Sequence, residues 1–467
     1  MKILLTNPPL FNLDSNFNRP VRFPAYNYAT PVMHPPLYLS YAAAYLLTKG
    51  HEVLLIDAPV LRMGPEKFVE QVAKYNPQFV VFETSTPSFK NDVLVAEKVK
   101  ERVETRVVFL GTHVSSLPEE SMGNKSIDAI IMGEYELTLA EYIESGPENT
   151  RGVCYRKDEK VIVNPHRERI KNLDMLPFPA RELLPNSKYF DPILENPFTY
   201  ILAGRGCPYR CIFCNWPQTL TGREYRMRSP KNIVDELEHI KRNYNFKSIL
   251  FNDDTLTASK ENVQGICSEI KRRNINLKWG CYARADERDE NLLDSMREAG
   301  CYLIKVGVES GNQMVLDNMR KGYQLDNVRN GIRLMKSKGF HVHATFAFGL
   351  PGEDISTIQE TIRFAKELDP TTVQFSIAVP YPGTEFFDYL KDNNFLITND
   401  WDNFVPTMPI YEYPNLSFEE MNSWLKKAYR TYYFRWKYIG LGTRKLFTQP
   451  KVLLASFRKL SRFVIDR

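Results

Sequence analysis

The sequence has little of several features that mark whole classes of protein. No apolar run approaches the roughly 18 residues expected of a transmembrane helix. Seven cysteines in 467 residues are too few, and odd in number, for a disulfide scaffold, which favours a reducing, cytoplasmic setting. The first residues, MKILLTNPPLF, lack the pattern of a signal peptide and indicate a first strand and turn. No internal repeat or low-complexity segment stands out.

Acidic residues are almost absent from the last 47 positions. Residues 421–467 contain twelve Lys or Arg and one acid, Asp466, for a net charge of +11. The other 420 residues contain 49 bases and 55 acids, so they carry −6 of the total +5. Such asymmetry indicates a partner with an anionic surface, either a membrane or a nucleic acid.

Residues 1–150 alternate short apolar runs with amphipathic helical patterns, the mark of a parallel sheet with helices on both faces. The expected strands are Lys2–Thr6, Glu52–Ile56, Phe79–Phe82, Val107–Leu110 and Ala129–Met132. We therefore expect an α/β fold that opens with a Rossmann-like domain. Ligands of such sheets bind at the carboxyl ends of the strands.

The rest of the chain divides into three parts. Residues 151–198 are expected to form a hairpin and a Pro-rich connector. Residues 199–390 repeat a strand–helix unit six times, which predicts a full or partial (β/α)6 barrel with functional loops after its strands. Residues 391–467 are expected to form a helical C-terminal region.

Three cysteines follow the first strand of this second series, in the spacing Cys-x3-Cys-x2-Cys. Cys207, Cys211 and Cys214 lie in a segment that Gly204, Gly206 and Pro208 keep irregular, so three thiolates can surround one centre. Thiolates are soft ligands suited to an iron–sulfur cluster or to zinc. Three ligands on a four-iron cluster leave one iron open to a cofactor, whereas a zinc site needs a distant fourth ligand.

This segment resembles the signature of the radical S-adenosylmethionine (radical SAM) superfamily, including an aromatic residue, Phe213, before the last cysteine. The resemblance implies an enzyme in which Cys207, Cys211 and Cys214 hold a [4Fe–4S] cluster whose open iron binds SAM. It also implies reductive cleavage of SAM to a 5′-deoxyadenosyl radical, with electrons from a donor such as ferredoxin or flavodoxin.

Further residues at strand ends match where the superfamily binds SAM. By the resemblance, the acids of Asn252-Asp253-Asp254 take the place of a Gly-Gly-Glu motif, Arg284 contacts the SAM carboxylate and Glu309 the ribose. Glycines permit close approach of a cofactor to a loop. The cofactor-binding set predicted for the barrel is Phe213, Asn252, Asp253, Asp254, Arg284, Glu309, Gly349 and Gly352.

The N-terminal region resembles the B12-binding domain fused to many radical SAM enzymes. Leu110-Gly111-Thr112-His113 and Met132-Gly133-Glu134 carry the likeness and make Gly111, His113 and Gly133 candidate cobalamin-binding residues. The chain has no Asp-x-His-x-x-Gly, the motif that supplies an axial histidine to cobalt. Bound cobalamin and a domain converted to substrate binding are both open, as is a strand-end role for His113.

The segment after the cysteines is similar to hopanoid-biosynthesis-associated radical SAM proteins and to archaeal calditol synthase. The likeness implies ring contraction of a lipid-linked hexose to a cyclopentyl polyol. The residues predicted to line the substrate side are Trp216, Gln218, Arg226 and Arg228. For the two arginines, pairing with surface acids is the alternative.

The basic C-terminal region suggests where such an enzyme acts. Ser417-x-x-Glu420 is a capping box that opens a helix rich in Trp, Tyr, Lys and Arg, and a second apolar stripe follows Pro450. This pattern favours a peripheral anchor on the inner face of the cell membrane over nucleic-acid binding. A helix packed on the barrel is the alternative.

Three functional hypotheses result. The first is radical ring contraction on a membrane-lipid head group. The second is a cobalamin-dependent radical SAM methyltransferase acting on a lipid or another natural product. The third is a non-catalytic lipid- or corrinoid-binding protein with a structural cluster.

Overall fold

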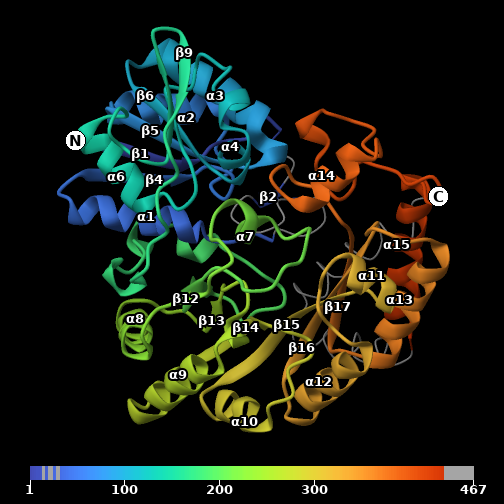
Figure 1. Cartoon of the computed structure of the whole chain (residues 1–467). Coiled ribbons are helices and arrows are strands. Elements are labelled where there is room, and N and C mark those ends of the chain that lie inside the picture. Colours follow the sequence, from blue (N-terminus) through green and yellow to red (C-terminus); the bar gives the residue numbers. More distant parts are fainter. Residues whose placement is uncertain (13–15, 19–24, 28–31, 436–467) are drawn as a thin grey trace.

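A computed structural model describes residues 1–12, 16–18, 25–27 and 32–435 of the 467. It shows two sheet-based domains, one above the other in Figure 1, with the C-terminal region along one side of both. The second half of the predicted membrane anchor, residues 436–467, lies outside the described residues.

The N-terminal domain is built on a seven-stranded sheet in the order β4-β1-β5-β6-β7-β8-β9. The first five of these strands are parallel, and the β8–β9 hairpin extends the sheet antiparallel to β7. The strands are β1 (Lys2–Asn7), β4 (Glu52–Asp57), β5 (Phe79–Thr84), β6 (Arg106–Gly111), β7 (Ala129–Ile131), β8 (Val153–Lys157) and β9 (Lys160–Val163). The order reverses between β1 and β5, where a sheet of this kind binds its ligand.

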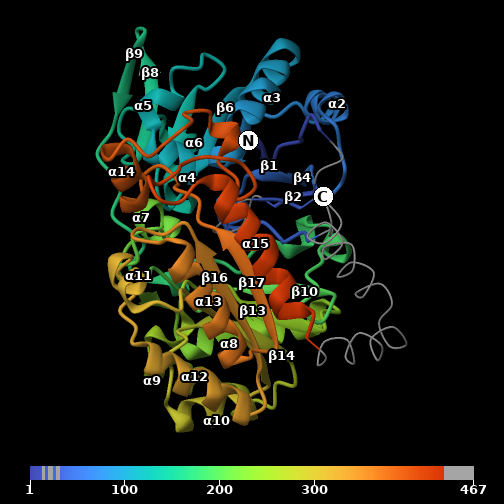
Figure 2. The same ribbon diagram turned by 90° about the vertical axis from the view of Figure 1, so that its right-hand side faces the viewer.

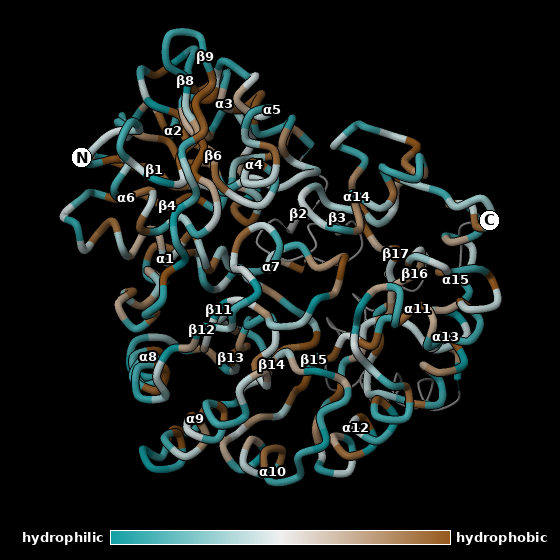
Figure 3. Tube along the Cα trace, in the orientation of Figure 1, coloured by the Kyte–Doolittle hydropathy of each residue, from teal (hydrophilic) through white to brown (hydrophobic). Residues whose placement is uncertain are grey.

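Helices cover both faces of this sheet, as continuous apolar strands require. They are α1 (Leu37–Thr48), α2 (Pro65–Tyr75), α3 (Phe89–Arg102), α4 (Thr112–Ser116), α5 (Pro118–Ser121) and α6 (Glu136–Ser145). A short antiparallel pair, β2 (Asn16–Asn18) and β3 (Ala25–Asn27), precedes α1. Hydrophobic segments run along the strands at the centre of each domain in Figure 3.

The second domain is an open barrel of six parallel strands in sequential order. They are β10 (Phe198–Ile201), β13 (Ser248–Phe251), β14 (Lys278–Ala283), β15 (Cys301–Glu309), β16 (His341–Phe348) and β17 (Thr372–Ile377). In the described part of the chain β10 and β17 are the two edges, so the barrel is partial. The predicted α/β fold class is therefore confirmed.

The helices of the barrel pack on its outer face and bury one large apolar cluster there. They are α8 (Pro230–Asn243), α9 (Lys260–Arg272), α10 (Glu290–Glu298), α11 (Gln313–Asn318), α12 (Leu325–Ser337) and α13 (Ile355–Leu368). Local signals fix their starts: Ser229 caps α8 ahead of Pro230, and Asp354 forms a capping box at α13.

A second apolar cluster joins the two domains. It includes Leu39 and Ala43 of α1, Leu184 of the connector, and Leu250 and Leu303 of the barrel strands. The Pro-rich connector contains three short helical turns, η2 (Leu173–Met175), η3 (Arg181–Leu183) and η4 (Asn186–Lys188). The shared core places the N-terminal domain and connector against the inner side of the barrel.

The C-terminal region contains α14 (Glu385–Asp392), η6 (Trp401–Asn403) and α15 (Phe418–Tyr433), and α15 lies along β17 in Figure 2. The Tyr429 hydroxyl accepts from the Phe375 amide at 3.1 Å and donates to its carbonyl at 2.9 Å. Tyr433 binds both backbone groups of Val373 in the same way. These two tyrosine hydroxyls provide hydrogen-bond partners for backbone groups on the outer edge of β17.

This packing corrects the interpretation of residues 417–433 as part of a lipid-facing anchor. The capping box at Ser417 forms as predicted, but the aromatic side chains of α15 are directed at the barrel, and Tyr432 is fully buried. Among the residues that the structure describes, no helix is long and apolar enough to cross a membrane.

Candidate functional site

The three cysteines lie on one loop, residues 206–225, whose ends are paired to each other. β11 (Gly204–Arg205) and β12 (Arg226–Met227) form a short antiparallel ladder at its base. Gly206 has φ +90°, and a Cβ there would lie 2.0 Å from the Glu224 carbonyl oxygen, so only glycine fits. The Cys207 amide then donates to the Gly222 carbonyl at 3.1 Å.

The donor set suits an iron–sulfur cluster. Cys207 and Cys211 are buried and Cys214 is half-buried, and all are free thiols. Burial, and then the charge of Asp254, raises the pKa of Cys207, so its thiolate needs a positive centre beside it. Within the described ranges no three His, Cys, Asp or Glu side chains converge on one metal ion. A four-iron cluster does not require this convergence, because each thiolate binds a different iron.

The acids after β13 brace the cluster loop. Asp253 is buried and accepts from the Ala203 amide at 3.0 Å and from the Tyr225 hydroxyl at 3.0 Å. The backbone N–H of the neighbouring Asn252 donates to the Ile201 carbonyl at 2.8 Å. Asp254 accepts from Thr221 at 3.2 Å and is the acid whose charge acts on Cys207. Of these three predicted SAM contacts, Asp254 is the one shown beside a cysteine.

Arg284, predicted to bind the SAM carboxylate, is paired with a nearby acid. Its guanidinium contacts Asp286 at 2.9 and 3.0 Å and lies between the rings of Tyr209 and Tyr323, 4.0 and 4.2 Å from their centroids. It also donates to the carbonyl of Gly322. SAM would therefore compete with Asp286 for this group.

Lys321 is a cation near the cysteines that the sequence reasoning missed. Its ammonium contacts Glu309 at 2.8 Å and lies 5.9 Å from the centroid of the Phe213 ring. Burial opposes its charge, yet Glu309 and, more weakly, Cys211 raise the pKa of Lys321 above its usual value. A single lysine in Arg320-Lys321-Gly322 has no motif around it, so only the fold reveals its place.

The Gly349–Gly352 loop after β16 is held closed by Glu353. Gly349 has φ +81° and a Cβ would meet the Tyr411 hydroxyl at 2.2 Å, while at Gly352 it would meet Asn318 at 2.4 Å. One Glu353 oxygen accepts from the amides of Gly349 and Leu350. The buried carboxyl group of Glu353 thus fixes the backbone of the loop that is predicted to approach SAM.

Two of the predicted substrate residues support the loop from within. Trp216, on α7 (Asn215–Thr219), is buried against Tyr38 with ring centroids 5.2 Å apart. The Gln218 amide donates to the carbonyls of Ile212 and Cys214 and accepts from the Glu385 amide. These contacts give both side chains a structural role beside the cluster.

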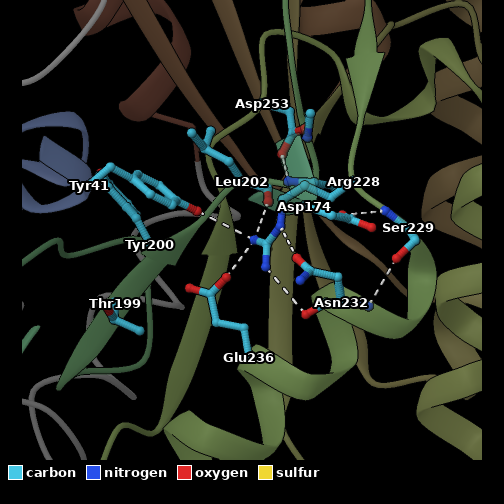
Figure 4. Close-up of polar contacts among 12 residues, drawn as sticks. Tyr41, Asp174, Thr199, Tyr200, Leu202, Arg228, Ser229, Asn232, Glu236 and Asp253 are labelled. Atoms are coloured by element: carbon cyan, nitrogen blue, oxygen red, sulfur yellow. Dashed lines mark hydrogen bonds and ion pairs between the residues drawn. The ribbon is translucent and has the colours of Figure 1, made fainter. Parts of the chain in front are cut away.

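The two predicted arginines are also engaged. Arg226 forms paired bonds to Glu134 at 2.7 and 2.9 Å. Arg228 bonds to Glu236, to Asn232 and to the Leu202 carbonyl, as Figure 4 shows. Both arginines and both acids are buried. The alternative interpretation, pairing with acids, describes these contacts, and the acids lie in the interior instead of on the surface.

The predicted cobalamin residues lie at the carboxyl ends of β6 and β7. Gly111 has φ +119°, and a Cβ would lie 2.2 Å from the Thr84 carbonyl oxygen. The Gly133 amide donates to Ser115. His113 is buried, and its Nδ1 lies 3.3 Å from the Thr86 hydroxyl rather than bonding to backbone.

The other ring nitrogen of His113, Nε2, has no hydrogen-bond partner in the described structure, and burial lowers the pKa of the imidazole to about 3. The rings of Phe89 and Trp401 enclose this neutral imidazole, with centroids 4.4 and 5.3 Å from its own.

Comparison with known proteins agrees with this geometry. Residues 201–365 match the radical SAM superfamily and residues 29–143 match the B12 binding domain. The chain is 30% identical to an uncharacterised methyltransferase of Pyrococcus horikoshii, over 100% of this chain and 97% of that protein. It is 27% identical to the hopanoid C-3 methylase of Methylococcus capsulatus, over 78% and 70%.

Two solved structures share the fold over most of the chain. The cobalamin-dependent SAM radical enzyme OxsB, with aqua-cobalamin bound, superposes with a TM-score of 0.74 at 16% identity, over 99% of this chain and 72% of that one. The radical SAM methyltransferase TsrM from Kitasatospora setae, with cobalamin and a [4Fe–4S] cluster, gives 0.68 at 19% identity, over 85% and 78%.

The full-length relative, the two family matches and the loop geometry agree on family and cofactors. The resemblance to radical SAM enzymes is thereby confirmed, as are the expected [4Fe–4S] cluster and SAM, and cobalamin is supported over a converted domain. This chain is an enzyme that belongs to the radical SAM superfamily, in the group whose radical SAM domain follows a B12-binding domain.

Proposed function

We propose that the protein is a cobalamin-dependent radical SAM methyltransferase. The observation that carries the proposal is a B12-binding domain joined to a radical SAM domain in a chain 30% identical, over its whole length, to a protein named as a methyltransferase. The similarity to a hopanoid methylase supports the same reaction class. These findings favour methyl transfer over the ring contraction expected from the segment after the cysteines.

The chain's residues have distinct parts in this proposal. When bound, the cluster, SAM and cobalamin supply radical generation and a methyl carrier. Cys207, Cys211 and Cys214 hold the cluster, and Gln218 and Asp253 fix the loop that bears them. We assign Lys321 as a buried cation for the SAM carboxylate, and its partner at 2.8 Å, Glu309, as the ribose contact.

The test is a product analysis of the reduced holoenzyme. We expect a corrin absorption band in the anaerobically purified protein, and S-adenosylhomocysteine together with a methylated product. Ring contraction would instead give a product without a new methyl group and no S-adenosylhomocysteine. A reduced protein that leaves SAM intact, with an active Cys211→Ala variant in cells, would support the non-catalytic alternative.

We infer a lipid as the substrate class. The hopanoid methylase relative and the +11 charge of residues 421–467 support this, because basic segments bind anionic membrane surfaces. Comparing the lipids of cells with and without the gene by mass spectrometry is the direct test. Deletion of residues 436–467 should weaken binding to anionic vesicles but not to neutral ones, and unchanged binding would contradict a membrane role for this segment.

A further inference from the structure

The base of the cluster loop carries two buried arginines that point to the other domain. Arg205 and Arg226 are directly opposite each other in the β11–β12 ladder, at the two ends of the segment that bears all three cysteines. Arg205 is separated from Cys207 by one glycine. The contacts of these two side chains therefore act on both ends of the loop.

Both arginines are held by one turn of the B12-binding domain. Glu134 and Glu136 lie just after β7, next to Gly133, at the edge where the cofactor of such a sheet binds. Glu136 makes paired bonds to Arg205, and Glu134 makes paired bonds to Arg226. Glu134 also lies 3.6 Å from the Arg205 guanidinium, so the four side chains form one network.

Further groups complete the enclosure of this network. The Arg205 guanidinium lies 4.8 Å from the Tyr38 ring centroid and 5.4 Å from that of Tyr41, both on α1 of the same domain. The Ile170 amide donates to Glu134 at 3.0 Å, and the Ile170 carbonyl accepts from Arg226 at 2.6 Å. Each of the four charged side chains is at most 4% exposed.

The network contains two arginines and two glutamates, so its charges balance. Its paired bonds require a guanidinium opposite each carboxylate. Burial opposes the charge on Glu134, but the hydrogen bond of Arg226 and the charges of both arginines hold its pKa below the usual value. Removing one partner leaves an uncompensated buried charge, which is strongly destabilising. Lysine keeps the charge but loses the two parallel bonds of a guanidinium.

We propose that Glu134, Glu136, Arg205 and Arg226 are positioning residues that fix the cluster loop to the cofactor edge of the B12-binding domain. The network sets the placement of the two cofactor sites relative to each other, through the ends of the loop. This inference rests on the proposed cobalamin-dependent function and concerns residues that touch neither the cluster nor SAM.

The barrel offers a control of similar chemistry away from the loop. Lys305, on β15, and Asp191, in the connector, form a buried ion pair at 3.2 Å, with side chains 7% and 4% exposed. Like the network above, this pair joins a cation to a buried carboxylate, but it lies outside the β11–β12 ladder. Asp191→Asn should therefore lower the thermal unfolding temperature without releasing the ends of the cluster loop.

The experiment compares Glu136→Gln, Arg205→Lys and Asp191→Asn holoenzymes with the wild type. Hydrogen–deuterium exchange of residues 206–225 is one readout. The magnetic dipolar coupling between cob(II)alamin and the reduced cluster, measured by pulsed electron paramagnetic resonance, is the other. In Glu136→Gln and Arg205→Lys, loss of a charge-assisted bond should speed hydrogen exchange in the loop by about tenfold or more. The distribution of dipolar couplings should become broader in the same two variants and stay unchanged in the control.

Two results would overturn the proposal. One is unchanged loop exchange and unchanged coupling in both Glu136→Gln and Arg205→Lys. The other is an equal change in Asp191→Asn, which would mark a general loss of stability. If the wild type carries no corrinoid, its absorption spectrum shows this and contradicts the proposed methyl transfer, while the exchange of residues 206–225 still decides the positioning role.

Discussion

Two buried ionisable residues near the cofactor edge of the barrel, Lys321 and Glu353, show how single side chains prepare the site. Lys321 brings a positive charge to the neighbourhood of Cys211 and Glu309. Glu353 fastens the Gly349 loop while leaving its oxygen Oε1 without a partner in the described structure. Neither role follows from a motif, because each depends on residues distant in the sequence or on backbone amides in a particular conformation.

Replacing Lys321 by methionine should weaken SAM binding while the cluster remains. The ammonium supplies a charge-assisted bond worth about a tenfold to hundredfold change in affinity. Titration of SAM against the cluster's electron paramagnetic resonance signal measures this. The iron content of the variant is the control, and unchanged SAM affinity with full iron content would contradict the assigned role.

Glu353 should make stability depend on pH. Burial raises the pKa of Glu353 to about 8, although the amides of Gly349 and Leu350 oppose this. The unfolded chain releases this proton near the usual 4.5, so the contribution is fully present below that value and is lost as pH rises to about 8. The slope is at most about 1.4 kcal/mol per pH unit.

Glu353→Gln should remove that slope, because the amide group stays neutral and its oxygen still accepts from the two backbone amides. Urea unfolding at pH 5.5 and pH 8 measures the difference. Compared with the wild type, the variant should gain stability at the higher pH. The same pH dependence in both proteins would show that Glu353 is ionised in the folded state.

At the level of elements, the exposed edge of β17 is closed by a helix instead of another strand. An open barrel leaves backbone donors and acceptors unpaired along its last strand, which is a liability for any sheet. Helix α15 meets this need with the hydroxyls of Tyr429 and Tyr433. The sequence predicted the helix and its cap, but its aromatic residues also matched an interfacial anchor, and only the adjacent strand edge separates the two interpretations.

Tyr429→Phe should destabilise the protein by about 1–3 kcal/mol, because the Phe375 amide and carbonyl lose their partner while remaining buried. Tyr389→Phe on α14 changes the same group on a residue that does not bind β17, and it should stay within about 0.5 kcal/mol of the wild type. Thermal unfolding of both variants tests this. Equal effects would mean that the hydroxyl bonds to the strand contribute little.

At the scale of the whole molecule, the C-terminal region binds both domains. Its helix α15 packs on the barrel, whereas Trp401 contacts the N-terminal domain. The Trp401 indole donates to Glu120 at 2.9 Å, and its ring centroid lies 5.3 Å from that of His113. Lys90 and Asp400 form an ion pair at the same contact. The indole thus helps to keep the imidazole of His113 away from water.

Trp401→Ala should therefore change how the free energy of unfolding depends on pH in acid. Burial lowers the pKa of His113 to about 3 from the usual 6.5, so its contribution to stability is present above 6.5 and is lost as pH falls towards 3. Exposure in the variant raises the folded-state pKa and reduces this loss between pH 6.5 and pH 4.5. Trp424→Ala on α15 is the control, and an identical acid response in both variants would contradict the account.

The cluster chemistry and the order of the strands and helices follow from local sequence patterns. Cysteine spacing and apolar periodicity are local properties, so Cys207, Cys211 and Cys214 and the alternation of strands and helices could be predicted without a fold. For Asp253, Gln218, Arg226 and Arg228 the structure shows buried protein partners, and their predicted ligand contacts stay predictions. A charged or amide side chain has the same sequence signature whether it binds a ligand or a buried partner.

The partners of these side chains appear only in the folded structure. It joins β8 to β7, places α15 on β17, and brings Glu134 and Glu136 to the arginines at the base of the cluster loop. Each of these pairings links residues far apart in the chain. Their physical cause is the need to satisfy charges and backbone groups that burial removes from water, which no local pattern can specify.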